Sequence, residues 1–397
     1  MPRLDAQTAG ESHGPALIIT ITGMPAGVGI DEAFINAELE RRQGGYGRGG
    51  RQKLETDHVE ILTGVRRGKA IGSPITFRIP NRDSRLDDLA KTPPVYRPRP
   101  GHADLAGSIK WLTTDCRETL ERASARETAS RVAAGAAARC LLREFGIESF
   151  GFVRSILSAG TSVEVTPANW HEHKLARDAS ETYCPDPAAT LQQHELIHGA
   201  KLSKDTAGGL IEAHVFGCPP GLGSCMDWRD KLDARIAYAV MGIQAIKSVE
   251  IGLGRDVASR PGSQVHDPIR FEASQREGPT LGFVRDTNRA GGTEGGMTNG
   301  QPVVVKAAMK PIATLLQGLP SVDLNTKQAL QSQYERSDIC AVPAASVVLE
   351  NVVSFEVARV FCDKFAGDSL TEVRAQFDAY LKYARMLPLD PPAMTIA

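Results

Sequence analysis

Residues 113–145 read TTDCRETLERASARETASRVAAGAAARCLLREF, and they decide what lies at the centre of the fold. The stretch is rich in alanine, arginine, glutamate and leucine, which are all good helix formers. Its many alanines and serines carry little bulk, so another element or a ligand can approach such a helix closely. We therefore predict one long helix here, the longest and most central of the chain.

Outward from this helix, strand-like and helix-like segments are mixed along the chain. Short β-branched runs bounded by glycine or proline predict strands, and helical patterns with acids first and arginines last match the helix macrodipole. The predicted strands lie at 16–24, within 59–79, within 208–223 and at 301–310, and the predicted helices lie at 31–43 and 228–243, with amphipathic helices around 345–364 and 369–386. This mixture predicts an α+β fold.

The chain shows no internal repeat and no clear linker, so we predict a single large domain over residues 1–397. The stretch 160–205 is polar and has the weakest pattern. We expect a polar surface excursion there, at about 163–200.

Composition and charge narrow the class of protein. The chain is 42% hydrophobic and 23% charged, as in soluble globular proteins, with a net charge of −1. This balance predicts no nucleic-acid partner and no membrane partner, and any bound anion must be captured by a local cluster of arginines. Seven scattered cysteines without a CxxC pair predict free thiols, and no signal-peptide pattern is present, so we expect a cytoplasmic protein.

Residues 10–14, GESHG, place His13 between small residues with glycine at both ends. Glycine lets the backbone bend sharply and lets a ligand come close. By itself the pattern is more typical of a turn histidine exposed to water. Both interpretations stay open at this point.

Three groups of arginines could converge on one anionic ligand, because guanidinium groups bind carboxylate and phosphate with paired hydrogen bonds. The alternative is a set of solvated faces, in which Arg122 and Arg126 pair with Glu118 and Glu121 on the same helix. The three groups are Arg41, Arg42, Arg48 and Arg51; Arg97 and Arg99 before His102; and Arg117, Arg122, Arg126 and Arg131.

The pattern HELIH at 194–198 fits the zinc-peptidase signature HExxH. Zinc needs a third ligand, which the chain does not convincingly offer, and Gly199 follows at once. We therefore predict no metal site. No nucleophile elbow, P-loop or dinucleotide-binding motif is present either.

Three separated stretches together resemble the chorismate synthase family. They are GESHGPALIITITGMPAGV (10–28), RPRPGHAD (97–104) followed by LERASARETASRVAAGA (120–136), and ERSDICAVPAASVVLE (335–350). Shorter motifs between them, such as NRAGGTEGGMTNGQP (288–302) and MKPIATL (309–315), occur in the family's order. Some positions depart from the pattern: Thr22 stands in place of an acid, Trp111 in place of a tyrosine, and Ser84 and Arg85 in place of an aromatic residue.

The resemblance implies a sandwich of antiparallel sheets and helices, assembled as a homotetramer. It implies that 5-enolpyruvylshikimate 3-phosphate is converted to chorismate by 1,4-anti elimination of phosphate, with reduced FMN as cofactor and NADPH only as reductant of the flavin. Two rival functions stay open: a zinc peptidase that uses His194, Glu195 and His198, and a non-catalytic module that binds flavin or an anionic metabolite.

The resemblance also assigns residues by motif position. His13, with Ser12 beside it, would protonate the departing phosphate, His102 would lie against the flavin, and Asp338 would help to move a proton from flavin N5. The implied substrate-binding residues are Arg42, Arg48, Arg99 and Arg126. The implied flavin-binding residues are Arg122, Ala123, Ser124, Gln244, Ala245, Gly295, Lys310, Pro311, Ile312, Ala313, Thr314 and Arg336.

Overall fold

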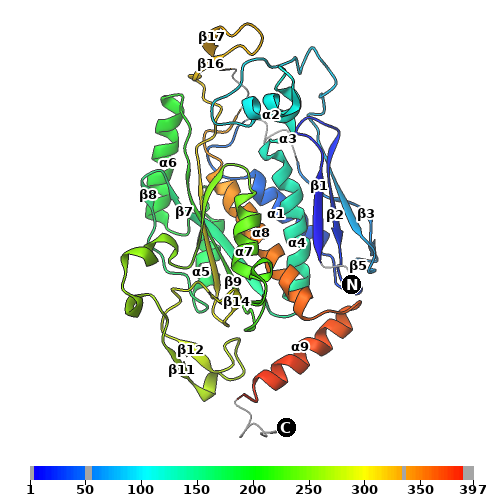
Figure 1. Cartoon of the computed structure of the whole chain (residues 1–397), viewed down its shortest axis with the longest axis vertical. Coiled ribbons are helices and arrows are strands. Elements are labelled where there is room, and N and C mark those ends of the chain that lie inside the picture. Colours follow the sequence, from blue (N-terminus) through cyan, green and yellow to red (C-terminus); the bar gives the residue numbers. More distant parts are fainter. Residues whose placement is uncertain (1–3, 50–55, 333–336, 388–397) are drawn as a thin grey trace.

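Two antiparallel sheets enclose a layer of helices in the computed structural model, which describes residues 4–49, 56–332 and 337–387 (Figure 1). The helices of the middle layer are α1 (Glu32–Gln43), α4 (Thr128–Arg143) and α8 (Val342–Lys364). Helix α4 lies against the smaller sheet and α8 against the larger one. The structure thus confirms the predicted α+β class with antiparallel sheets and helices.

The smaller sheet has the strand order β1 (Asp5–Ala9), β2 (Ala16–Thr22), β6 (Ile75–Pro80) and β3 (Glu60–Thr63). Alternate side chains of β2 point to opposite faces, so Leu17, Ile19 and Ile21 are fully buried while the residues that follow each of them are partly exposed. Ile19 pairs with Phe77 of β6. The strands predicted at 16–24 and within 59–79 are confirmed, and the turn between β3 and β6 carries the short strands β4 (Val65–Arg66) and β5 (Lys69–Ala70).

The larger sheet has the order β10 (Ile246–Ile251), β15 (Val303–Met309), β9 (Gly209–Phe216), β7 (Glu148–Ile156) and β8 (Ala159–Gly160). Its strands pair antiparallel throughout. The strands predicted within 208–223 and at 301–310 are therefore its β9 and β15.

Helices α4 and α8 cross in close contact because small residues of α4 face α8. A Cβ atom on Gly135 would lie 2.2 Å from the backbone oxygen of Asn351, so only glycine allows this approach. Two expectations are wrong here. Among the described residues the longest helix is α8, with 23 residues, and it is buried on almost every side rather than amphipathic. Its polar side chains Glu350 and Asn351 are satisfied inside the protein, by Arg41 and Glu38 among others.

The stretch 113–145 is not one helix, which corrects the opening prediction. It forms α3 (Arg117–Arg122), a 3₁₀ turn (Ala125–Glu127) and then α4. Ser124 interrupts the helix: its backbone is extended, with φ −62° and ψ 142°, and its side chain accepts a hydrogen bond from the N–H of Arg126. Serine side chains compete with helical backbone bonding in this way.

The remaining elements surround this frame. Within the stretch predicted as a surface excursion, α5 (Trp170–Asp178) and α6 (Pro187–Leu202) pack against the edge of the larger sheet, and buried Arg177 of α5 donates a hydrogen bond to Glu350 of α8. In the described part of the chain, no helix combines the length and apolar character needed to cross a bilayer. The elements that surround the two sheets and the central helices are α2 (Asp104–Trp111), α5 (Trp170–Asp178), α6 (Pro187–Leu202), α7 (Leu232–Met241), α9 (Leu370–Ala384), and the two-stranded pairs β11 (Ile269–Phe271) with β12 (Phe283–Arg285), β13 (Thr293–Glu294) with β14 (Met297–Thr298), and β16 (Pro320–Val322) with β17 (Ala329–Gln331).

Candidate active site

A cavity of about 640 Å³ brings together segments from the whole length of the chain. Its walls come from the loop after β1, the end of α1, the loop 81–103, the break between α3 and α4, the turn after α7, the segment after β15 and the first turns of α8. Strand and helix ends from both sheets and the helix layer thus meet at this edge of the sandwich. The size suits a small-molecule ligand together with a cofactor.

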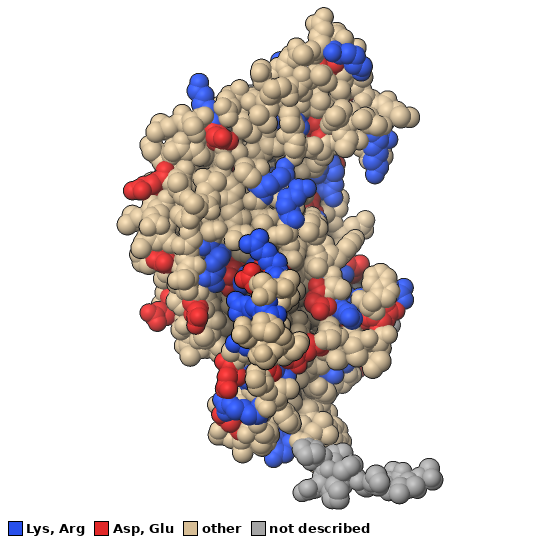
Figure 2. Space-filling model, turned by 60° about the vertical axis from the view of Figure 1, so that its left-hand side comes forward, with Lys and Arg blue, Asp and Glu red and all other residues tan. Residues whose placement is uncertain are grey.

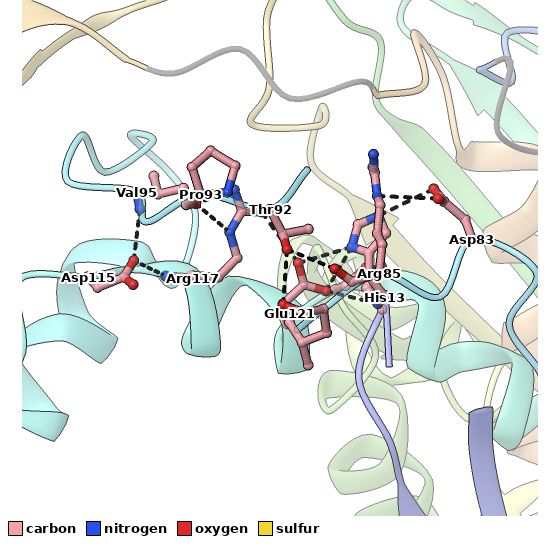
Figure 3. Close-up of polar contacts among 12 residues, drawn as sticks. His13, Asp83, Arg85, Thr92, Pro93, Val95, Asp115, Arg117 and Glu121 are labelled. Carbon is pink, nitrogen blue, oxygen red and sulfur yellow. Dashed lines mark hydrogen bonds and ion pairs between the residues drawn. The ribbon is translucent and has the colours of Figure 1, made fainter. Parts of the chain in front are cut away.

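His13 lies in the cavity wall and is only 9% exposed, so the exposed-turn interpretation is wrong. Its Nδ1 lies 2.8 Å and 3.0 Å from the two carboxylate oxygens of Glu121, and its backbone N–H donates to the same carboxylate at 2.9 Å. On the other side of the ring, Nε2 lies 3.4 Å from Arg85 and 3.7 Å from Asp83 (Figure 3). Ser12, beside it, lines the cavity and accepts a hydrogen bond from the Ser124 hydroxyl.

His102 has a similar environment at another part of the wall. Its Nδ1 lies 2.5 Å from the fully buried carboxylate of Asp104, which also accepts hydrogen bonds from Arg99 at 2.8 Å and 3.1 Å. Burial alone would raise the pKa of Asp104, but the hydrogen bonds from His102 and Arg99 and the charge of Arg99 hold that pKa well below its usual range. Arg99 also donates to the Thr314 hydroxyl at 3.0 Å.

Arg42 and Arg126 form a buried pair of cations around Asp57. Arg126 donates to both Asp57 oxygens at 2.6 Å and 2.7 Å, whereas Arg42 is 3.4 Å from the nearer one. Burial lowers the pKa of Arg42 to about 10, with Asp57 opposing that shift and Arg126 and Arg48 adding to it. One carboxylate therefore does not balance the local positive charge, and Arg42 is still protonated at pH 7.

Arg48 and Asp338 meet at the edge of the cavity, although 290 positions separate them. Arg48 donates to one Asp338 oxygen at 2.5 Å, and the backbone N–H of Gly49 donates to the other at 2.6 Å. The Nε of Arg48 is buried and has no hydrogen-bond partner among the described residues. A buried donor of this kind needs a ligand or a water, because an unsatisfied polar group costs free energy.

Another part of the wall is apolar and built from small residues. Ala341, Ala344 and Ala345 of α8 line it, together with the segment 309–314 after β15. Gln244 and Ala245 adjoin that segment, and Ala245 has a φ of 68°, which is uncommon for a residue with a side chain. A flat ring system fits such a wall, so the residues present suit a flavin.

The cavity is strongly cationic, unlike the molecule as a whole. Of the charged side chains that line it within the described ranges, six are basic and two are acidic: Arg42, Arg48, Arg85, Arg99, Arg126 and Lys310 against Asp83 and Asp338. On the face in Figure 2, by contrast, basic and acidic side chains are interspersed. The cavity is thus suited to a small polyanion.

The structure gathers most of the residues singled out from the sequence. Those at the cavity are Ser12, His13, Arg42, Arg48, Arg99, His102, Ala123, Ser124, Arg126, Gln244, Ala245, Lys310, Pro311, Ile312, Ala313, Thr314 and Asp338. Two do not line it: Arg122 donates to the backbone oxygens of Thr8 and Gly10, and Gly295 lies in the turn between β13 and β14. Arg336 and Arg51 lie outside the described residues.

Sequence reasoning missed the carboxylates behind the cavity. The alternative pairing of Arg126 with a glutamate of its own helix is wrong, because Arg126 binds Asp57 and Asn81. Glu121 binds His13 instead. Arg85 also lines the cavity, although no motif assigned it a role. Its only signal in the sequence was that Ser84 and Arg85 replace an aromatic residue of the family pattern.

His194 of the HELIH pattern stacks on Tyr46, with ring centroids 3.5 Å apart, and forms an ion pair with Glu181 at 3.4 Å. Among the described residues, no group of three or more His, Cys, Asp or Glu side chains is placed to hold a metal ion.

Comparison with known proteins agrees with this picture. The family model described as chorismate synthase matches residues 4–362. A chorismate synthase of Geobacter metallireducens is 51% identical over 391 residues, which is 95% of this chain and 98% of that protein. One of Desulforamulus reducens is 51% identical over 390 residues, covering 96% of this chain and 99% of that protein. A solved structure described as a crystal structure of chorismate synthase superposes with a TM-score of 0.79 at 38% identity, over 97% of this chain and 99% of that one.

Proposed function

Because this chain belongs to the chorismate synthase family, we propose that it converts 5-enolpyruvylshikimate 3-phosphate to chorismate, with reduced FMN as cofactor. The reaction is a 1,4-anti elimination of phosphate and a ring hydrogen, so the enzyme is a carbon–oxygen lyase of the shikimate pathway. We further propose a cytoplasmic homotetramer that binds no nucleic acid, in which NADPH serves only to reduce the flavin.

One observation carries the proposal: the cavity combines a large excess of basic side chains with two histidines, each held by a buried carboxylate. The substrate has two carboxylates and a phosphate. Arg42, Arg48, Arg99 and Arg126 supply fixed guanidinium groups for such anions. Their pairing with buried acids holds them in place before the substrate arrives, which lowers the cost of ordering them on binding.

His13 is the proposed acid for the leaving phosphate. The C–O bond to phosphate breaks more readily when its bridging oxygen receives a proton or a positive charge. With Nδ1 bound to Glu121, the imidazole can offer that proton from Nε2. Ser12 adds a hydroxyl beside it.

Reduced FMN, when bound, supplies an electron transiently and takes up the C6 hydrogen of the substrate. His102, lying against the flavin, would stabilise negative charge there as an imidazolium, with Asp104 holding its Nδ1. Asp338, fixed by Arg48 and Gly49, would accept a proton at its carboxylate. The proposed flavin-binding residues at the cavity are those of 123–124, 244–245 and 310–314, while Gly295, Arg122 and Arg336 keep that assignment from motif position alone.

The test is turnover without oxygen. Purified protein is mixed with reduced FMN and 5-enolpyruvylshikimate 3-phosphate in an anaerobic chamber, and chorismate and free phosphate are measured over time. We expect both to appear in equal amounts. A protein that binds the substrate and flavin but releases neither product would be a binding module, and the proposal would fail.

A further inference from the structure

Glu121 lies directly behind His13 and is 1% exposed (Figure 3). Besides the imidazole contacts, its carboxylate accepts the backbone N–H of His13, and its backbone oxygen accepts the N–H of Ser12 at 3.1 Å. The loop that carries His13 is therefore attached to α3 by main chain and side chain together. Nothing in the motif assignments gives Glu121 a role.

The contact determines which ring nitrogen carries a proton. An ionised carboxylate can only accept hydrogen bonds, so the Nδ1 that faces it must be protonated. Burial alone would raise the pKa of Glu121, but hydrogen bonds from His13 and the charges of His13 and Arg117 hold that pKa below its usual value. Glu121 is thus a carboxylate at neutral pH, and Nδ1–H of His13 donates to it.

A second layer of contacts holds Glu121 and the opposite side of the ring. Arg117, one turn earlier on α3, reaches Glu121 at 3.4 Å and donates twice to the backbone oxygen of Pro93 at 3.0 Å and 3.1 Å. Asp115 accepts the backbone N–H of Val95 at 2.8 Å. These contacts attach the loop 81–103 to α3 and to the residues just before it.

That same loop carries the groups that face Nε2. Asp83 and Arg85 form an ion pair at 3.2 Å, and the backbone N–H of Arg85 donates to the backbone oxygen of His13 at 2.9 Å. The charged groups around the imidazole are therefore Glu121 and Arg117 from α3, and Asp83 and Arg85 from the loop. All four lie within one connected network (Figure 3), and the two groups that face Nε2, Asp83 and Arg85, line the cavity.

We propose that Glu121 is a positioning residue for His13, which keeps the proton on Nδ1 and directs Nε2 toward the cavity as the nitrogen that gives up a proton. This inference rests on the proposed function, and it adds the group that orients the acid. In the reaction, the C–O bond breaks and its electron pair stays on the phosphate oxygen, which receives the proton from Nε2. Glu121 remains ionised throughout and stabilises the imidazolium before transfer, as carboxylates do for catalytic histidines elsewhere.

The first experiment reads the tautomer directly. The ¹⁵N spectrum of histidine-labelled protein, without substrate or flavin, is recorded at a pH where the imidazoles are neutral, and the His13 signals are assigned by their loss in His13→Ala. We expect a protonated Nδ1 and an unprotonated Nε2 for His13. An unprotonated Nδ1 would overturn the inference, whether or not the wild-type enzyme makes chorismate.

The second experiment separates positioning from folding. Glu121→Gln keeps the shape and a hydrogen-bond acceptor but removes the charge, and Glu118→Gln makes the same change at an exposed position of the same helix. We expect Glu121→Gln to lower kcat by about 10- to 100-fold with KM and flavin affinity nearly unchanged. The alkaline limb of the kcat profile should move to lower pH, because the negative charge beside the imidazolium is removed. Glu118→Gln should match the wild type.

Two results would contradict the role of Glu121. One is a wild-type kcat and pH profile in Glu121→Gln; the other is the expected loss in kcat without any movement of the alkaline limb of the kcat profile. Should Glu121→Gln fail to fold, the tautomer of the wild-type protein still decides the question. An inactive wild type in the anaerobic assay would count against the proposed function, whereas the tautomer tests the Glu121 contact alone.

Discussion

At the scale of single residues, the same contact between a histidine and a buried carboxylate occurs twice in the site. His13 is held by Glu121 and His102 by Asp104, each through Nδ1 and each with a buried carboxylate. In both histidines this buried carboxylate faces Nδ1 and not Nε2. The histidines differ in their second neighbour, since Arg85 faces Nε2 of His13 whereas Arg99 lies beside Nδ1 of His102.

Replacing His13 by alanine should remove the proposed acid and leave the cavity otherwise intact. We expect His13→Ala to retain FMN binding, measured by fluorescence titration, and to lose about 10²- to 10⁴-fold in turnover. His58→Ala, at an exposed histidine, is the matched control. Wild-type turnover in His13→Ala would remove His13 from the mechanism.

Arg48 should act mainly on substrate affinity, because its buried Nε faces no described partner while NH1 holds Asp338. A hydrogen bond to a charged group contributes about 1.5–3 kcal/mol, so Arg48→Ala should raise KM by about 10- to 100-fold and change kcat less. Steady-state kinetics in the anaerobic assay measure both constants. The exposed Arg66→Ala should leave them unchanged, and an unaltered KM in Arg48→Ala would contradict the assignment.

At the scale of elements, two small residues in one stretch have opposite effects on a helix. Ser124 ends the helical run and turns the segment 123–126 toward the cavity. Gly135, farther along, lets α4 continue while α8 lies against it. The interruption and the close crossing together place the first turns of α8 beside the arginines of the site.

The crossing of α4 and α8 can be tested with one methyl group. Gly135→Ala would place a Cβ atom 2.2 Å from the Asn351 backbone oxygen, so the helices must move apart. We expect a loss of at least about 1–3 kcal/mol in the free energy of unfolding, measured by urea denaturation.

Gly199→Ala is the matched change in α6, where the added Cβ would meet no atom within 4 Å. It should raise the free energy of unfolding by about 0.5–1 kcal/mol, because alanine loses less conformational freedom in a helix than glycine. Equal effects of the two substitutions would show that α4 and α8 are not in the close contact described here.

At the scale of the whole molecule, the charges are nearly balanced, with a net charge of −1, yet the cavity is cationic. The balancing acids lie behind the walls, where Asp57, Asp104 and Glu121 are buried against the basic side chains and histidines. The site therefore depends on buried carboxylates, of which Asp104 and Glu121 stay ionised because their pKa values lie below the usual range.

Acid should destabilise the protein for this reason. Despite burial, which alone would raise them, the pKa values of Glu121, Glu127 and Asp104 are lowered by hydrogen bonds and neighbouring positive charges. A lowered folded-state pKa contributes stability above the ordinary value, 4.5 for glutamate and 3.8 for aspartate, and this stability is lost as the pH falls through the folded-state value.

We expect the Tm to be steady near neutral pH and to fall progressively below about pH 4.5. The free energy of unfolding should decrease there by about 1.4 kcal/mol per pH unit for each additional proton that the unfolded state binds. Glu356 acts in the opposite sense, because burial raises its pKa. Calorimetry between pH 3 and pH 8 measures the profile. A Tm that is constant down to pH 3 would mean that the pKa values of these acids are not lowered in the folded protein.

The sequence by itself determined the mixture of strands and helices, the strand β2, the ends of α1 and the motif positions of most cavity residues. These features depend on neighbours within a few positions, so periodicity, caps and motifs carry them. The same reasoning predicted a continuous helix over 113–145, because propensity favours it, and an amphipathic α8, because its polar residues resemble a solvated face.

Only the tertiary structure decided which charges meet. Glu121 binds a histidine 108 positions away, and Arg126 binds an aspartate 69 positions away. It also buried the polar residues of α8 by surrounding them with the arginines of other helices. Partners of buried charges are selected by the layers that fold around them, and no local pattern in the chain records that selection.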